Sequence, residues 1–201
     1  MPQWILASAS PRRKALLEAL GLDIEVWPAD VAERSDGAPR ELVIGNARLK
    51  RDAVARRAPA AACVIAADTV VTHGGQVLGK PSDMDEARRM LAALSGKTHR
   101  VYTGLAVTDT GQRRSADAHE VTEVTFRPLS EAMIETFVEA VQPFDRAGAY
   151  TVDGPGSLLV ERYSGCYQNV LGLPLVRLDR LLESIGLSLF SCVDSQRATF
   201  L

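Results

Sequence analysis

The sequence predicts an α/β protein with a mixed β-sheet flanked by helices. Three observations support this class. Strand-like and helix-like segments alternate along the chain, residues 63–67 form an apolar run with β-branched side chains, and residues 40–58 repeat apolar side chains at helical spacing. Such a run is typical of a central strand, and such alternation is typical of a sheet covered by helices.

The first half of the chain supplies strands separated by two helices. Its patterns predict strands over 4–8, 23–27, 63–67, 70–72 and 77–78. Helices are predicted over 11–20, ended by Gly21, and over 40–58.

The second half continues the alternation. Its patterns predict helices over 84–94, 131–141 and 175–185, and strands over 99–109, 116–126 and 158–161. Ser82 with Asp85 resembles a capping box for the helix at 84–94, and Ser130 is a good N-cap for the next helix. We expect one domain over residues 1–201, with a loosely ordered tail after about residue 188.

Composition narrows the class of partner. The net charge is −2, which gives no bulk attraction to nucleic acid or to an anionic membrane. The three cysteines share no close spacing, so we expect a reducing compartment and neither a disulfide framework nor a zinc site. No run approaches the roughly 18 apolar residues of a membrane-spanning helix. We therefore expect a soluble cytoplasmic protein; its oligomeric state stays open, with a homodimer among the alternatives.

A basic helix start is the strongest local signal of function. Ser10 is suited to the N-cap and Pro11 to the first helical position, and three cations follow at 12–14. Cations in a first turn oppose the helix dipole, each at a cost of a few tenths to ~1 kcal/mol. A bound polyanion would reverse that sign, because backbone N–H groups and guanidinium forks would converge on it. The pattern therefore favours a phosphate site, the alternative being a solvated basic turn.

Two further motifs carry charged groups suited to phosphate chemistry. Asp68 follows the apolar run 63–67, where it could hold a divalent cation or accept a proton from water, or simply bond to the next turn. Lys80, between Gly79 and Pro81, lies on a stiff turn that is not a Walker A loop. Lys50 and Glu33 are informative only together with these residues.

The ordered set of these motifs resembles the Maf family of nucleotide pyrophosphatases. The matching segments run nearly the whole chain: LASASPRR (6–13), Glu33, NA (46–47) with Lys50, ADT (67–69), GKP (79–81), LSGKTH (94–99), YTG (102–104), DRAGAY (145–150) and NVLGLP (169–174). The resemblance implies an elongated α/β fold like that of Maf and inosine triphosphatase proteins, with two lobes around a deep nucleotide-binding cleft. It also implies cleavage of a nucleoside triphosphate to a monophosphate and pyrophosphate, with dependence on Mg²⁺ or Mn²⁺.

The resemblance assigns roles to individual residues. Asp68 would be the catalytic carboxylate, acting as a base or a metal ligand, and Glu33 would help to hold the metal. The residues expected around the triphosphate are Ser8, Ser10, Arg12, Arg13, Lys50 and Lys80.

Three positions of the family separate two base specificities. The dTTP/UTP type carries Arg, Thr and Gln there, and the 7-methyl-GTP type carries Trp, Gln and Glu. Arg12 and Thr69 fit the first type, whereas Asp153 stands where that type has Gln. An ionised Asp only accepts hydrogen bonds, so it would leave O4 of a pyrimidine without a donor and would suit a guanine better. We favour dTTP/UTP, and a purine-directed or broadened preference stays open.

Two different classes of function remain as alternatives. The protein could regulate cell division by binding a protein partner, with the nucleotide as a signal. It could instead be a sugar-nucleotide transferase, although 201 residues leave little room for a second substrate domain. Modified nucleotides are a further candidate substrate within the pyrophosphatase reading.

Overall fold

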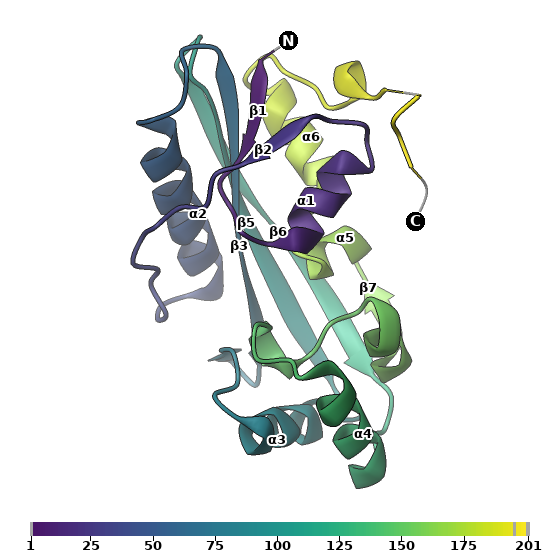
Figure 1. Ribbon diagram of the computed structural model, residues 1–201. Helices are drawn as coiled ribbons and strands as arrows, with labels where there is room; N and C mark the ends of the chain where they lie inside the picture. The colour runs from purple at the N-terminus through teal and green to yellow at the C-terminus, as the bar shows by residue number, and fades with distance from the viewer. Residues whose placement is uncertain (1, 195, 200–201) are drawn as a thin grey trace. The chain divides into compact units, whose positions relative to one another are not determined.

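A mixed β-sheet forms the framework of the computed structural model, which describes residues 2–194 and 196–199 (Figure 1). Within these residues the sheet has seven strands in the order β2-β1-β3-β5-β6-β7, with β4 paired to β3. The strands are β1 (Gln3–Leu6), β2 (Ile24–Val26), β3 (Ala62–His73), β4 (Gln76–Leu78), β5 (Thr98–Asp109), β6 (Arg114–Phe126) and β7 (Val160–Ser164). β1 is parallel to both β2 and β3, whereas β4 and β7 pair antiparallel with their neighbours. The predicted mixed α/β class is confirmed.

Helices follow the strands in the predicted alternation. The α-helices are α1 (Pro11–Glu18), α2 (Pro39–Ala55), α3 (Met84–Leu94), α4 (Glu131–Val141), α5 (Tyr167–Val170) and α6 (Leu175–Glu183). Short 3₁₀ turns are η1 (Ala147–Ala149), η2 (Gly154–Leu159) and η3 (Phe190–Cys192). None of the helices within the described part of the chain is long and apolar enough to cross a membrane.

The chain divides into two compact units. Unit 1 comprises residues 1–68, 103–120 and 172–201, and unit 2 comprises residues 69–102 and 121–171. In unit 1, α2 lies on one side of β1, and α1 and α6 lie on the other (Figure 1). Alternate strand residues, among them Ile5 and Val64, pack with Val54 of α2, and all three are fully buried. Burial on both faces explains why the parallel strands read as continuous apolar runs.

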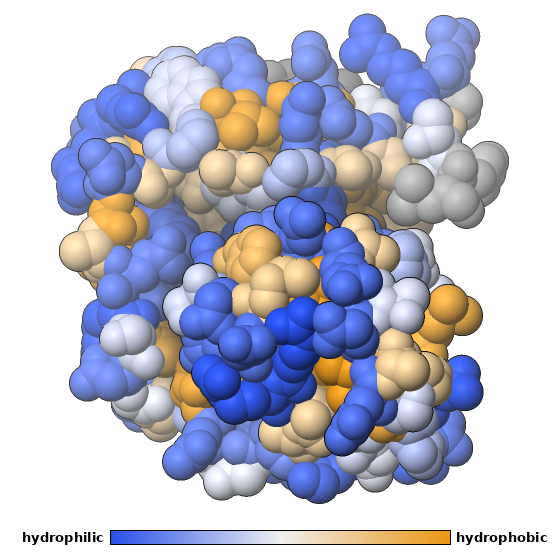
Figure 2. All heavy atoms as spheres, turned by 60° about the horizontal axis from the view of Figure 1, so that its bottom comes forward, coloured by the Kyte–Doolittle hydropathy of each residue, from blue (hydrophilic) through white to orange (hydrophobic). Residues whose placement is uncertain are grey.

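Unit 2 has its own apolar core beneath α3 and α4. The core includes Leu91 and Leu94 of α3, Phe137 of α4 and Phe126 of β6. On the outer face, Arg88 of α3 pairs with a glutamate of α4, Nη2 to Oε1 at 2.6 Å. Figure 2 turns these helices toward the viewer and shows mainly hydrophilic side chains with smaller hydrophobic areas between them.

Two local predictions need correction, and a third is confirmed. Asp83, not Ser82, is the N-cap of α3, and its carboxylate accepts the Glu86 N–H. Glu86 in turn accepts the N–H of Ser82, the residue before the N-cap, whereas a capping box returns to the N–H of the N-cap itself. The strand expected over 158–161 begins only at Val160, because the residues before it close the 3₁₀ turn η2. Ser130 caps α4 as predicted, accepting the Met133 N–H.

The C-terminal segment, for which we expect loose order, makes backbone contacts with the end of α1 in its described part. Asp194 N–H donates to the Leu20 carbonyl at 3.4 Å, and Thr199 N–H donates to the Ala19 carbonyl at 3.0 Å. Leu189, just before η3, is buried. These contacts supply hydrogen-bond donors to carbonyl groups that a helix end leaves without internal partners.

Candidate active site

A buried carboxylate marks the centre of the site in unit 1. Asp68 lies inside β3, not after it as expected, because the strand continues to His73. The neighbouring strand β1 ends where Leu6 pairs with Ile65, so Asp68 projects beyond the end of β1. Its side chain is nevertheless enclosed, with the residue only 6% exposed. A charged carboxylate at such burial requires partners, and helix α2 supplies them.

Helix α2 holds Asp68 through two side chains one turn apart. Lys50 Nζ lies 2.7 Å from Asp68 Oδ1, and Asn46 Nδ2 donates to Asp68 Oδ2 at 3.0 Å. Residues at positions i and i+4 share one helix face, so a single face of α2 contacts both carboxylate oxygens. Both side chains lie among the buried residues of that face.

Close packing brings this face of α2 to the sheet. Gly104 of β5 lies directly under the helix, and a Cβ atom built on it would overlap with the carbonyl group of Val43 and approach Ile44 N to 2.7 Å. Only glycine permits this approach of strand backbone to helix backbone. The YTG motif thus has a structural role in placing the turn of α2 that precedes Asn46.

A second carboxylate meets the same lysine. Glu33, from the loop between β2 and α2, places Oε1 3.0 Å from Lys50 Nζ. Its side chain is half exposed, whereas that of Asp68 is enclosed. Lys50 therefore carries its ammonium group between two carboxylates, one at the surface and one buried.

Electrostatics keep Asp68 ionised. Burial by itself raises the pKa of this carboxyl, but the charge and hydrogen bond of Lys50, the hydrogen bond from Asn46 and the charge of Arg13 outweigh burial and lower it below its ordinary value. Burial also lowers the pKa of Arg13, an effect that the Asp68 charge opposes. Asp68 is thus a charged acceptor at neutral pH, suited to binding a cation or orienting water.

Arg13 ties the strand ends together. Its Nε donates to the Gly172 carbonyl at 2.8 Å, and its Nη1 donates to Ser8 Oγ and to the Ala67 carbonyl, both at 2.9 Å. Arg13 is 8% exposed, so these bonds form away from bulk water. They connect the segment after β1 with β3 at the residue preceding Asp68.

The basic turn at the start of α1 has the predicted backbone but not the predicted cap. Ser10 occupies the N-cap position with Pro11 next to it, and its side chain makes no capping hydrogen bond. Its N–H instead donates to Ser8 Oγ at 3.3 Å. Arg12, in the first turn, is half-buried.

The remaining predicted residues belong to unit 2. Thr69 is half-buried and begins that unit, and Lys80 and Asp153 are exposed. The carbonyl of Gly79, next to Lys80, accepts the Gly148 N–H at 3.0 Å, which links the GKP turn to the DRAGAY segment. The contacts described above thus join five of the predicted residues within unit 1: Ser8, Arg13, Glu33, Lys50 and Asp68. Those contacts do not include Thr69, Lys80 or Asp153.

Sequence reasoning missed Asn46 as a site residue. The available signal was its position four residues before Lys50 on one helix, which places both side chains on the same face.

The donor set of the site fits a hard divalent cation completed by a substrate. Asp68 and Glu33 each place a carboxylate oxygen next to the Lys50 ammonium group. Across residues 2–194 and 196–199, no cluster of three or more His, Cys, Asp and Glu side chains could form a full metal cage. Mg²⁺ is typically bound by one or two carboxylates plus phosphate oxygens, which matches two carboxylates without a cage.

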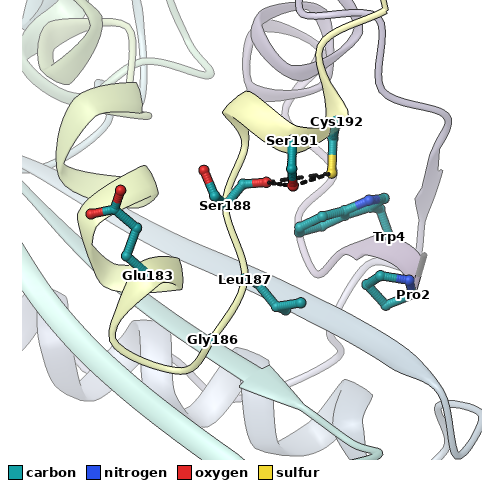
Figure 3. A pocket seen from close by; sticks show the side chains of 8 residues that line it. All are labelled: Pro2, Trp4, Glu183, Gly186, Leu187, Ser188, Ser191 and Cys192. Atoms are coloured by element: carbon teal, nitrogen blue, oxygen red, sulfur yellow. Dashed lines mark hydrogen bonds between the residues drawn. The ribbon is translucent and has the colours of Figure 1, made fainter.

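A cavity of about 540 Å³ in unit 1 lies apart from this set of residues (Figure 3). Trp4 of β1 forms one wall, and Leu187, Ser188 and Cys192 of the C-terminal segment form others. None of its lining residues is a predicted site residue.

Comparisons with known proteins agree with the arrangement of motifs. A protein of Bacillus cereus named dTTP/UTP pyrophosphatase is 43% identical over 93% of this chain and 97% of its own. Proteins of the same name from Carboxydothermus hydrogenoformans and Pelotomaculum thermopropionicum are 44% and 45% identical, over 90% and 92% of this chain and 97% and 98% of their own. Among solved structures, the Staphylococcus aureus Ham1 protein aligns over 62% of this chain and 71% of that chain, with a TM-score of 0.42 and 15% identity, too low to support an argument. The family model described as Maf-like protein matches residues 3–185, and the chain therefore belongs to the Maf family.

Proposed function

We propose that this protein is a nucleoside triphosphate pyrophosphatase that cleaves dTTP and UTP between the α and β phosphates. The observation that carries the proposal is the buried, ionised Asp68 held by Lys50 and Asn46, in a chain 43% identical to a relative named dTTP/UTP pyrophosphatase. Such a carboxylate can orient a water molecule and accept its proton during an in-line attack on the α-phosphorus. The products would be a nucleoside monophosphate and pyrophosphate.

Glu33 and Asp68 are the residues proposed to hold a divalent cation, Mg²⁺ or Mn²⁺. That ion supplies positive charge to the triphosphate when bound. Lys50, which contacts both carboxylates, is then placed to bind phosphate oxygens and to stabilise the charge that develops on the leaving pyrophosphate.

The basic turn and the GKP turn are proposed to bind the rest of the triphosphate. Ser8, Ser10 and Arg12 lie at the start of α1, where backbone N–H groups and the helix dipole favour an anion. We propose that Arg13, predicted as a phosphate ligand, acts mainly through its three hydrogen bonds to protein oxygens. Lys80 is exposed and free of burial costs, so it suits a phosphate of the leaving group.

Base preference is proposed to follow the names of the relatives, with Arg12 and Thr69 as the residues that match the dTTP/UTP type. Asp153 is the residue that tests this preference, because its carboxylate offers no donor for O4 of a pyrimidine. Replacement by Gln would restore a donor, and we expect Asp153→Gln to raise turnover of UTP relative to GTP.

We propose that both units form one Maf-like domain, which works in the cytoplasm on a small-molecule substrate. The continuous match of the family model over 3–185, which includes residues of both units, supports the single domain. A role as a regulator of cell division through a protein partner has no residue of the site in its favour. Cleavage of modified nucleotides would use the same groups.

The test is a nucleotide panel with Mg²⁺ or Mn²⁺: UTP, dTTP, CTP, GTP, ATP, 7-methyl-GTP and 5-methyl-UTP, with products resolved by anion exchange. We expect pyrophosphate with UMP or dTMP, and no turnover by Asp68→Asn, while that variant still binds nucleotide. Diphosphate plus phosphate as products, or no turnover of any member by the unmodified protein, would refute the proposal.

A further inference from the structure

We propose that Asn46 is the positioning residue that holds Glu33 and Asp68 in one fixed arrangement around Lys50. The inference rests on the proposed function, since it concerns the two carboxylates of that reaction. It assigns to Asn46 no contact with substrate; its effect passes entirely through the groups that it orients.

The contacts of Asn46 reach both carboxylate-bearing segments. Its Oδ1 accepts the Arg34 N–H at 2.9 Å, and its Nδ2 donates to the Arg34 carbonyl at 3.0 Å. The same Nδ2 donates to Asp68 Oδ2 at 3.0 Å. Because Arg34 follows Glu33 directly, one amide group fixes the backbone beside Glu33 and the side chain of Asp68 at once.

Only an amide side chain of this length can make all three bonds. A carboxamide has one acceptor oxygen and two N–H donors, and the geometry uses the oxygen and both donors. Aspartate lacks the donors and would add a second negative charge beside Asp68. The single hydroxyl group of a serine cannot bond the N–H and the carbonyl of Arg34 and also the carboxylate of Asp68.

Burial makes this arrangement rigid. Asn46 is 2% exposed, so water cannot replace a lost bond without a rearrangement. Residues 32–38 of the loop that carries Glu33 are exposed, so the loop gains little stabilisation from burial. The two bonds to Arg34 thus fix the backbone next to Glu33, whose Oε1 lies 3.0 Å from Lys50 Nζ.

The experiment compares Asn46→Ala, which removes all three bonds, and Asn46→Asp, which keeps the size but removes the donors. Val54→Ala is the matched control, because Val54 is buried on the same helix and packs in the apolar cluster away from Asp68. Each variant is checked by far-UV circular dichroism for its fold. Amide exchange at Arg34 is measured without metal or nucleotide, and kcat and KM for UTP are measured at saturating Mg²⁺.

We expect kcat to fall about 10- to 100-fold in both Asn46 variants, the range typical for groups that orient the ligands of a site. KM should change much less, because misplaced carboxylates weaken the transition state more than substrate binding. Arg34 exchange should accelerate at least about 10-fold in Asn46→Ala, since its acceptor is lost, and should not change in Val54→Ala.

Retention of kcat in Asn46→Ala within about threefold would overturn the inference, as would a fall of equal size in Val54→Ala. In Asn46→Ala, a fall in kcat with unchanged amide exchange at Arg34 would overturn the anchoring of Glu33. If the unmodified protein hydrolysed no nucleotide, the proposed function would fail, and faster Arg34 exchange in Asn46→Ala alone would still support the anchor.

Discussion

The buried histidine of unit 2 predicts a loss of stability in mild acid. His99 is 2% exposed, its Nε2 lies 2.8 Å from the Tyr150 hydroxyl, and its Nδ1 has no hydrogen-bond partner among the described residues. Burial, with a smaller contribution from His73, lowers the pKa of His99 from 6.5 to about 4. The folded state therefore binds this proton less readily than the unfolded state does. The contribution of the neutral His99 to the free energy of unfolding is fully present above pH 6.5 and falls as the pH is lowered toward 4.

The size of the effect follows from the two pKa values. A difference of about 2.5 units corresponds to about 3 kcal/mol in full, of which about 2 kcal/mol is lost between pH 7 and pH 5. His99→Gln removes the titrating ring while keeping a polar group for Tyr150. The variant also loses edge contacts with Phe126 and Tyr150, whose ring centroids lie 4.9 and 5.3 Å away, so we expect lower stability at pH 7.

The assay is urea unfolding of both proteins at pH 7 and pH 5 at constant ionic strength. The remaining ionisable groups are common to both proteins, so the contributions that do not involve residue 99 cancel in the comparison. We expect the difference in the free energy of unfolding between wild type and variant to shrink by about 2 kcal/mol at pH 5. An equal difference at both pH values would refute the reasoning.

Three further substitutions test the packing around the site and the caps. Gly104→Ala should lower stability by about 1–3 kcal/mol and reduce turnover, because the new Cβ overlaps with Val43 and displaces α2; an unchanged melting temperature would contradict this. Arg13→Lys should cost about 1–3 kcal/mol in urea unfolding, since one ammonium group cannot replace bonds to three oxygens; an unchanged free energy of unfolding would speak against this role. Asp83→Ala should lower the melting temperature through loss of the α3 cap, and a calorimetric melting temperature equal to that of the unmodified protein would show that Asp83 does not stabilise the helix start.

Strong periodic patterns made much of the fold predictable. The helix expected over 84–94 has those bounds, and the apolar run at 63–67 is part of the central strand β3. The extension of β3 through Asp68 and Thr69 was not predictable, because polar residues at the end of an apolar run look like a strand end. What keeps them in the strand is tertiary: Lys50 and Asn46 approach from α2 and satisfy the carboxylate.

The site divides in the same way. The position of Asp68 after an apolar run pointed to this residue, and the resemblance to the Maf family added Glu33 and Lys50. The structure brings these three into contact. Asn46 carries no charge and belongs to no phosphate pattern, so its role depends on which backbone groups the loop presents to it. For Ser10 the sequence indicates the place at the helix start. Whether its side chain caps the helix depends on the geometry of the turn, which the sequence does not determine.

The distribution of aromatic residues between the units has a practical consequence. Both tryptophans of the sequence, Trp4 and Trp27, lie in unit 1, and all four tyrosines, Tyr102, Tyr150, Tyr163 and Tyr167, lie in unit 2. Selective excitation of tryptophan therefore reports on unit 1, whereas the ultraviolet absorbance of tyrosine, corrected for tryptophan, reports on unit 2. The chain carries a natural optical label in each unit. One denaturation series, read at two wavelengths without any added dye, can show whether the units unfold together or in sequence.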